Sequence, residues 1–86
     1  MSKSPVMKID TDGTRTYLPD REPTLEEMQE VVGGLIEPVA IPGTQKVLLA
    51  NEEGLLMGLE QNLMASTLVG RNIVGPVLVM PSSYLR

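Results

Sequence analysis

The segment of residues 51–62 constrains the fold most, because it can reverse the chain between two aliphatic runs. Its sequence is Asn-Glu-Glu-Gly-Leu-Leu-Met-Gly-Leu-Glu-Gln-Asn, and an acidic tip at 51–54 separates the aliphatic residues 47–50 from 55–59. Asparagine and glycine tolerate the positive φ values that a reversing chain needs, while adjacent glutamates favour water. The pattern predicts a β-hairpin with its tip at 51–54, and the other segments are interpreted as supports for it.

A second hairpin is predicted near the N-terminus. Asp12 and Gly13 lie between two alternating segments, and an Asp-Gly pair in this setting is a good short-range hairpin signal. We therefore expect strands at about 5–10 and 14–18. A flexible tail with one turn is the alternative, because an isolated hairpin is marginal without a sheet to join.

A helix is predicted to begin after Thr24. The Thr24 hydroxyl can accept a hydrogen bond from the backbone N–H of Glu27, and the Glu27 carboxylate can accept one from the N–H of Thr24. Glycines 33 and 34 predict the end of the helix, since glycine readily adopts the left-handed cap conformation. Apolar residues recur at spacings of three and four, which predicts one buried stripe. The stripe consists of Leu25, Met28, Val31 or Val32, and Leu35.

Two further strands complete the predicted sheet, at 35–41 and about 73–80, and the strand that leads into the 51–54 tip spans 45–50. Pro38 has no N–H to donate, so the first of these is expected at a sheet edge or at a bulge. Residues 61–67 fit either a short helical turn or an irregular crossing. The predicted fold is therefore α+β, with one amphipathic helix packed on a mainly antiparallel sheet of about five strands. We expect a single domain over 1–86, with flexible ends at 1–4 and 82–86.

Composition excludes several kinds of function. The chain has no cysteine and no histidine, which removes disulfides, thiolate and Ser-His nucleophiles and most zinc sites. The net charge of −4 disfavours a nucleic-acid partner. Arg71, Asn72 and several turn residues interrupt the most apolar segment, 63–80, so a membrane span is not expected. We expect a cytoplasmic protein that is not an enzyme and uses no cofactor.

The predicted tip supplies three candidate binding residues. Glu52 and Glu53 could hold a divalent cation together with Asn51, but one tip lacks the six or more oxygen ligands of a calcium loop. A solvated tip is the preferred interpretation. Asn51 and the fourth candidate, Asn62, fit turn and cap residues better than ligands.

Two charged residues outside the tip are also candidates. Glu37 lies in an apolar strand, so its side chain either faces solvent or pairs with a cation such as Arg71 or Lys46. Arg71 is the only charged residue between Glu60 and Arg86. It is either a solvent-exposed loop residue or a bidentate donor to phosphate or carboxylate.

A pattern of glycine, asparagine and apolar residues extends over about residues 24–80. It consists of Leu25, Val32, Gly33, Gly34, Ile36, Glu37, the segment 51–54, Gly58, Leu59, Asn62, Val74, Gly75 and Pro76. In this pattern the chain resembles a family of small, functionally unassigned proteins found widely in bacteriophages and mobile elements. The resemblance implies no reaction, but it implies a setting in the cytoplasm of a host cell, where small acidic phage proteins often act by binding.

Three functional hypotheses follow. The favoured one is a non-catalytic accessory protein that inhibits a host defence protein by binding it. The second is a homo-oligomer that sequesters a nucleotide-like host signal, with Arg71, Lys46 or Arg15 facing the ligand at subunit junctions. The third is a weak enzyme or metal-dependent module built on three glutamates, Glu37, Glu52 and Glu53.

Self-association is expected because the C-terminal part is rich in apolar residues. Residues 61–86 contain Arg71 and Arg86 as their only charges, and we expect one helix and a small sheet to leave part of this segment uncovered. We therefore predict a homo-oligomer whose interface uses one face of the strand at 73–80.

Overall fold

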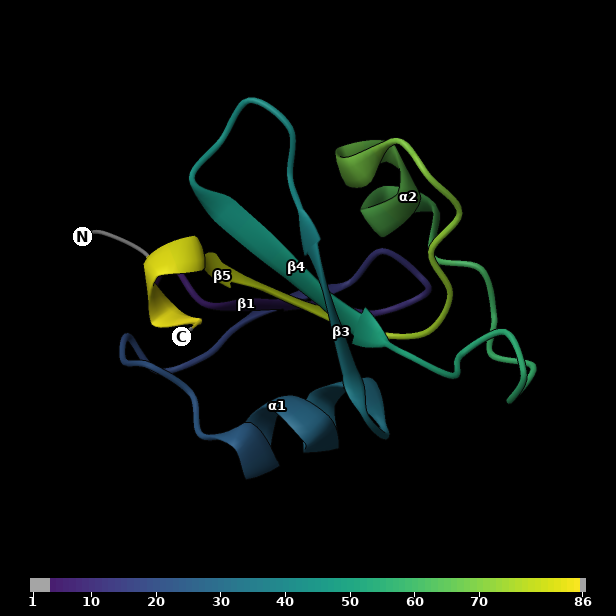
Figure 1. The fold of residues 1–86 in the computed structure, drawn as a ribbon, viewed down its shortest axis with the longest axis horizontal. Coiled ribbons are helices and arrows are strands. Elements are labelled where there is room, and N and C mark those ends of the chain that lie inside the picture. The colour runs from purple at the N-terminus through teal and green to yellow at the C-terminus, as the bar shows by residue number, and fades with distance from the viewer. Residues whose placement is uncertain (1–3, 86) are drawn as a thin grey trace.

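A five-stranded antiparallel sheet lies between two α-helices in the computed structural model, which describes residues 4–85 (Figure 1). The strand order is β2-β1-β5-β4-β3. In chain order the elements are β1 (Met7–Ile9), β2 (Arg15–Tyr17), α1 (Leu25–Val32), β3 (Ile36–Ala40), β4 (Lys46–Asn51), α2 (Leu63–Val69), β5 (Val77–Pro81) and the 3-10 helix η1 (Ser82–Tyr84). The α+β prediction and the N-terminal hairpin of β1 and β2 are confirmed.

Both ends of α1 have the predicted caps. The Glu27 backbone N–H donates to Thr24 Oγ1 at 3.1 Å, and the Thr24 N–H donates to Glu27 Oε1 at 2.8 Å. Gly33 ends the helix with φ of 80°, in the left-handed region where a side chain is strained. These bonds involve only neighbouring residues, which explains why the sequence predicts the helix boundaries well.

The predicted apolar stripe of α1 is only partly buried. Met28 and Val32 are buried, whereas Leu25 and Leu35 are 56% and 53% exposed. Placing Leu25 and Leu35 in the core was therefore wrong. Helical spacing gives the direction of a side chain around the axis, but it does not say how far along the axis the sheet extends. Leu35 also lies beyond the left-handed Gly33, where helical spacing no longer applies.

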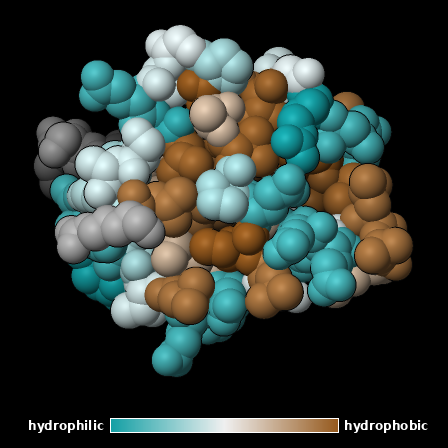
Figure 2. All heavy atoms as spheres, viewed as in Figure 1, coloured by the Kyte–Doolittle hydropathy of each residue, from teal (hydrophilic) through white to brown (hydrophobic). Residues whose placement is uncertain are grey.

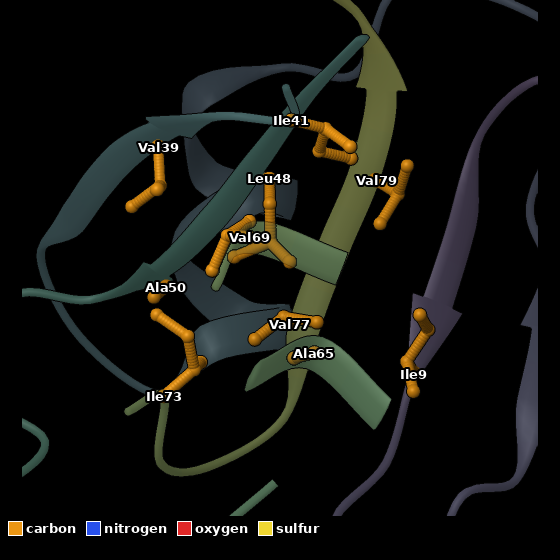
Figure 3. Packing of buried hydrophobic residues seen from close by; sticks show 10 residues of the cluster. All are labelled: Ile9, Val39, Ile41, Leu48, Ala50, Ala65, Val69, Ile73, Val77 and Val79. Carbon is orange, nitrogen blue, oxygen red and sulfur yellow. The ribbon is translucent and has the colours of Figure 1, made fainter. Parts of the chain in front are cut away.

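The two faces of the sheet carry separate apolar clusters, since successive strand residues point to opposite faces. In β4, Leu48 and Ala50 belong to one cluster, and Val47 and Leu49 belong to the other. The first cluster includes two buried residues of α2, as Figure 3 shows. Its members are Ile9, Val39, Ile41, Leu48, Ala50, Ala65, Val69, Ile73, Val77 and Val79. The second includes Met28 and Val32 of α1 and lies on the opposite face.

The predicted interface on the strand at 73–80 is wrong. Strand β5 lies between β1 and β4, and residues 77–80 are all buried within the chain. The error arose because the sequence did not distinguish a helical turn from an irregular crossing at residues 61–67. The structure has the helix α2 there, and this helix covers the face of the sheet that was expected to be exposed. Homo-oligomerisation through another surface stays a prediction.

The predicted hairpin with its tip at 51–54 is also wrong. Residues 55–59 form no strand, and β4 pairs instead with β3 and β5. The segment 52–59 is a loop of successive turns. The edge position predicted from Pro38 is confirmed, because β3 is the last strand of the sheet and pairs only with β4.

The C-terminal segment is folded where flexibility was expected. The backbone N–H and Oγ of Ser82 donate to the Gln45 carbonyl oxygen at 2.9 Å and 2.8 Å. Tyr84 and Leu85 pack against the α1-side cluster. Residues 1–3 and 86, part of the predicted flexible ends, lie outside the described residues. Between residues 4 and 85, neither helix is long and apolar enough to cross a membrane.

Candidate functional site

A pocket of about 310 Å³ beside the 52–59 loop brings together five of the six predicted site residues. These five are Glu37, Asn51, Glu52, Glu53 and Arg71. They come from β3, from the end of β4, from the loop and from the segment that follows α2. The sequence analysis placed Asn51, Glu52 and Glu53 at a hairpin tip and Glu37 and Arg71 outside it, so it did not predict that all five line one pocket.

Glu37 and Arg71 form an ion pair across this pocket. The distance from Arg71 Nη2 to Glu37 Oε2 is 3.2 Å, and the two side chains are 53% and 39% exposed. Pairing of Glu37 with Arg71, one of the predicted alternatives, is therefore observed. A pair this exposed contributes at most about 1 kcal/mol to folding. Its effect is to orient both side chains beside the loop.

Asn51 holds the start of the loop through hydrogen bonds of its side chain. It is 5% exposed, and its Nδ2 donates to the Val32 carbonyl oxygen at 3.1 Å. Its Oδ1 accepts a bond from the Glu53 backbone N–H at 2.8 Å. Both ends of the amide are thus used inside the protein, which fits the predicted structural role of Asn51 as a turn residue.

Two glycines allow the loop to pack closely on the rest of the chain. A Cβ atom added to Gly54 would lie 2.7 Å from Val74 Cγ2, and one added to Gly75 would lie 2.7 Å from Leu59 Cδ1. Real Cβ atoms do not approach other heavy atoms so closely. The prediction that Gly54 uses a positive φ is wrong, because its φ is not positive, and its contact with Val74 is the reason that glycine is needed there.

Asn62 lies outside the pocket and is fully buried. Its Oδ1 accepts a bond from the Ala65 N–H at 3.0 Å, which caps α2. Its Nδ2 donates to the carbonyl oxygens of Ile9 and Gly75 at 3.1 Å and 2.9 Å. Asn62 is thus the cap residue that the sequence favoured over a ligand, and it also joins three segments of the chain.

The sequence missed three exposed apolar residues on the loop. Leu55, Leu56 and Met57 are 72%, 87% and 55% exposed. Figure 2 shows brown, apolar side chains at the right-hand edge of the molecule, where this loop lies in Figure 1. They had been assigned to a strand. The close spacing of Gly54 and Gly58 around only three apolar residues was the available signal for a turn.

Among residues 4–85, no group of three or more acidic side chains is close enough to hold a metal ion. Arg71 is paired with Glu37. Arg15 in β2 and Lys46 in β4 lie on strands separated by β1 and β5, so these cations do not converge with one another within one chain.

A larger pocket of about 440 Å³ lies between α1, the β1–β2 hairpin and the linker 19–23. On its border, Arg21 Nη1 and Nη2 donate to the two carboxylate oxygens of Glu27, each at 2.7 Å. These bonds, with the Thr24 backbone N–H, lower the pKa of Glu27 to about 2. They raise the pKa of Arg21. The sequence gave no sign of this pocket, because its lining comes from distant segments.

Comparison with known proteins identifies a family. The sequence model of a family described as "Domain of unknown function (DUF3846)" matches residues 2–83. No curated protein and no solved structure matches the chain.

Proposed function

The chain belongs to the family described as Domain of unknown function (DUF3846), and on this premise we propose that it acts without catalysis, by binding a protein through the loop 52–58. We call this segment the apolar loop. The observation that carries the proposal is the exposure of Leu55, Leu56 and Met57 at three successive positions of a loop that hydrogen bonds hold in place.

Exposed apolar residues in a row are costly unless they meet a partner. Fully burying one such side chain contributes roughly 1.5–3 kcal/mol. Single exposed apolar residues are ordinary on protein surfaces, but clustered ones mark interaction sites. Three in one short segment favour contact with another protein.

The apolar loop is held in one shape before any partner arrives. The Met57 N–H donates to the Glu53 carbonyl oxygen at 2.9 Å, and the Leu59 N–H donates to the Gly54 carbonyl oxygen at 3.1 Å. Asn51 holds the start of the loop through Glu53. Ordering a flexible segment on binding costs free energy, so a loop that is already ordered binds more tightly.

Charges around the apolar loop define the kind of partner. Glu37, Glu52 and Glu53 line the adjoining pocket, where Arg71 is the single cation. The partner surface that complements this arrangement is an apolar recess bordered by lysine or arginine. Opposite charges of this kind increase the association rate and the specificity of a complex. The function we favour is the inhibition of a host protein by occupation of such a recess.

Affinity capture with matched variants tests the proposal. Lysate of the host cell is passed over the wild type, over Leu55→Ser/Leu56→Ser, and over the control Leu25→Ser/Leu63→Ser. The control leucines are also more than half exposed, but they are the first residues of α1 and α2. Quantitative mass spectrometry is expected to find a protein retained by the wild type and the control and lost by the loop variant.

Binding and activity measurements with the purified captured protein then test the proposal directly. The captured protein should bind the wild type more weakly as salt rises, because its basic border is screened. It should also lose its own activity when the wild type is added. Equal binding of that protein by all three forms would contradict the proposal, provided that circular dichroism shows each form to be folded.

A further inference from the structure

The 440 Å³ pocket beside α1, which we call the hairpin groove, is a second candidate binding site. Helix α1 packs mainly on β3, β4 and β5, so it leaves β1 and β2 uncovered on its face of the sheet. The volume falls within the range of about 300–1,000 Å³ that is usual for small-molecule sites. The apolar lining consists of Val6, Leu18, Pro19, Pro23, Val31 and Leu78.

The border of the hairpin groove is already ordered. Arg21 and Glu27 satisfy each other through two short hydrogen bonds. Glu27 also accepts from the Thr24 N–H, which fixes its position relative to α1. These two charged groups therefore shape the groove, and their charges largely cancel.

Lys8 and Thr16 supply the remaining donors on the sheet side. They are directly paired across β1 and β2, and both line the groove. The Lys8 ammonium pairs with Asp10 Oδ1 at 3.5 Å, which is its one ion pair with residues 4–85, and its side chain is only 33% exposed. Lysine carries three N–H donors, so further donors remain for a ligand. The anion Glu30, on the α1 side, is exposed, and water screens it more strongly.

We propose that the hairpin groove binds a small amphipathic molecule with an apolar body and one anionic end. The apolar body lies over Leu18, Pro19 and Val31, and the anionic group accepts hydrogen bonds from Lys8 and Thr16. Charge complementarity at Lys8 distinguishes this ligand from a neutral or cationic one of the same shape. The site is separate from the apolar loop and does not depend on its function.

Three probes with the same eight-carbon body test the proposal: octanoate, octanol and octylammonium. Each is titrated into isotope-labelled protein, and backbone amide shifts are followed by NMR. Octanoate is expected to shift the amides of Lys8, Thr16 and Val31 and to bind about tenfold more tightly than octanol, as one charge-assisted hydrogen bond allows. Lys8→Gln should remove this difference, whereas Lys46→Gln, an exposed lysine outside the groove, should keep it.

A second variant tests the cavity itself. Val31→Trp adds volume on the α1 side of the hairpin groove and should abolish octanoate binding without unfolding, because Val31 is only partly buried. Three results would overturn the proposal: equal affinities for the three probes, tighter binding of octylammonium, or octanoate binding that Val31→Trp leaves unchanged.

Discussion

Asn51 Nδ2 donates a hydrogen bond to the Val32 carbonyl oxygen at 3.1 Å, and this contact joins the last turn of α1 to the start of the apolar loop. The acceptor belongs to a fully buried residue. Asn51→Ala leaves this carbonyl and the Glu53 N–H without their partner, so we expect a loss of about 2 kcal/mol in unfolding free energy. Urea denaturation measures it. Asn72→Ala, an exposed asparagine nearby, should change stability by less than about 0.5 kcal/mol.

The contact between Gly54 and Val74 gives a prediction with a built-in rescue. Gly54→Ala places a Cβ 2.7 Å from Val74 Cγ2, and such overpacking typically costs about 1–3 kcal/mol. Val74→Ala removes the clashing methyl group. The double variant should therefore be more stable than the sum of the two single changes predicts, by at least about 0.5 kcal/mol. Strict additivity in a double-mutant cycle would contradict this account of Gly54.

The uneven burial of the α1 stripe predicts opposite results at two apolar positions. Met28 is 8% exposed and Leu25 is 56% exposed. Met28→Ala should cost about 2–5 kcal/mol, because it opens a cavity in the α1-side cluster. Leu25→Ala should cost less than about 0.5 kcal/mol. Thermal unfolding of both variants checks the contrast, and comparable losses would mean that Leu25 packs as the sequence pattern suggested.

Features set by neighbouring residues could be predicted from the sequence. The Thr24 and Glu27 cap, the Gly33 termination and the Asp12–Gly13 turn each depend on bonds within a few positions. The edge position of β3 follows from the missing N–H of Pro38. In these cases the type of one residue decides the local backbone structure, and contacts with distant residues do not change it.

Features set by distant residues were missed or misassigned. The aliphatic run fits a strand at 55–59, but the chain turns there, with Gly58 at a φ of 70° and Gly54 packed on Val74. Helix α2 depends on the Asn62 cap and on burial of Ala65 and Val69 against the sheet. Glu37 and Arg71 were singled out because charged residues in apolar surroundings are visible in sequence. The exposure of the apolar loop could not be predicted in this way, because the exposure of a side chain depends on the tertiary structure.

The cap of α1 predicts a pH dependence of stability. The Arg21 guanidinium and the Thr24 N–H hold the pKa of Glu27 at about 2, below its usual value of 4.5. A lowered pKa in the folded state means that Glu27 stabilises the fold above about pH 4.5 and loses this effect as the pH falls towards 2. The difference in urea midpoint between wild type and Glu27→Gln should therefore shrink over this interval.

Glu26→Gln is the matched control for that titration. Glu26 is also in the first turn of α1, but it makes no hydrogen bond with the described residues. Its variant should follow the wild-type profile between about pH 2 and 4.5. A constant difference between wild type and Glu27→Gln over that interval would show that the carboxylate is not held as the structure describes.

The last prediction concerns the buried side-chain amide of Asn62. Replacing its nitrogen by an oxygen turns a hydrogen-bonded contact into a repulsive one. Asn62 Nδ2 donates to the carbonyl oxygens of Ile9 and Gly75. In Asn62→Asp this donor becomes a carboxylate oxygen, which faces two acceptors in a fully buried position. An uncompensated buried charge costs about 3–5 kcal/mol, so the variant should lose at least about 3 kcal/mol of stability at neutral pH.

Acidification should restore part of this loss. Burial and the two facing carbonyl oxygens raise the pKa of the introduced carboxyl, because both disfavour its charged form. Once protonated, it can donate one hydrogen bond, to either the Ile9 or the Gly75 oxygen, which recovers about 1 kcal/mol. The stability difference from wild type should therefore narrow between pH 7 and pH 4. Asn72→Asp, at an exposed site, should show no comparable narrowing, and a pH-independent deficit for Asn62→Asp would contradict the hydrogen-bond assignment of this amide.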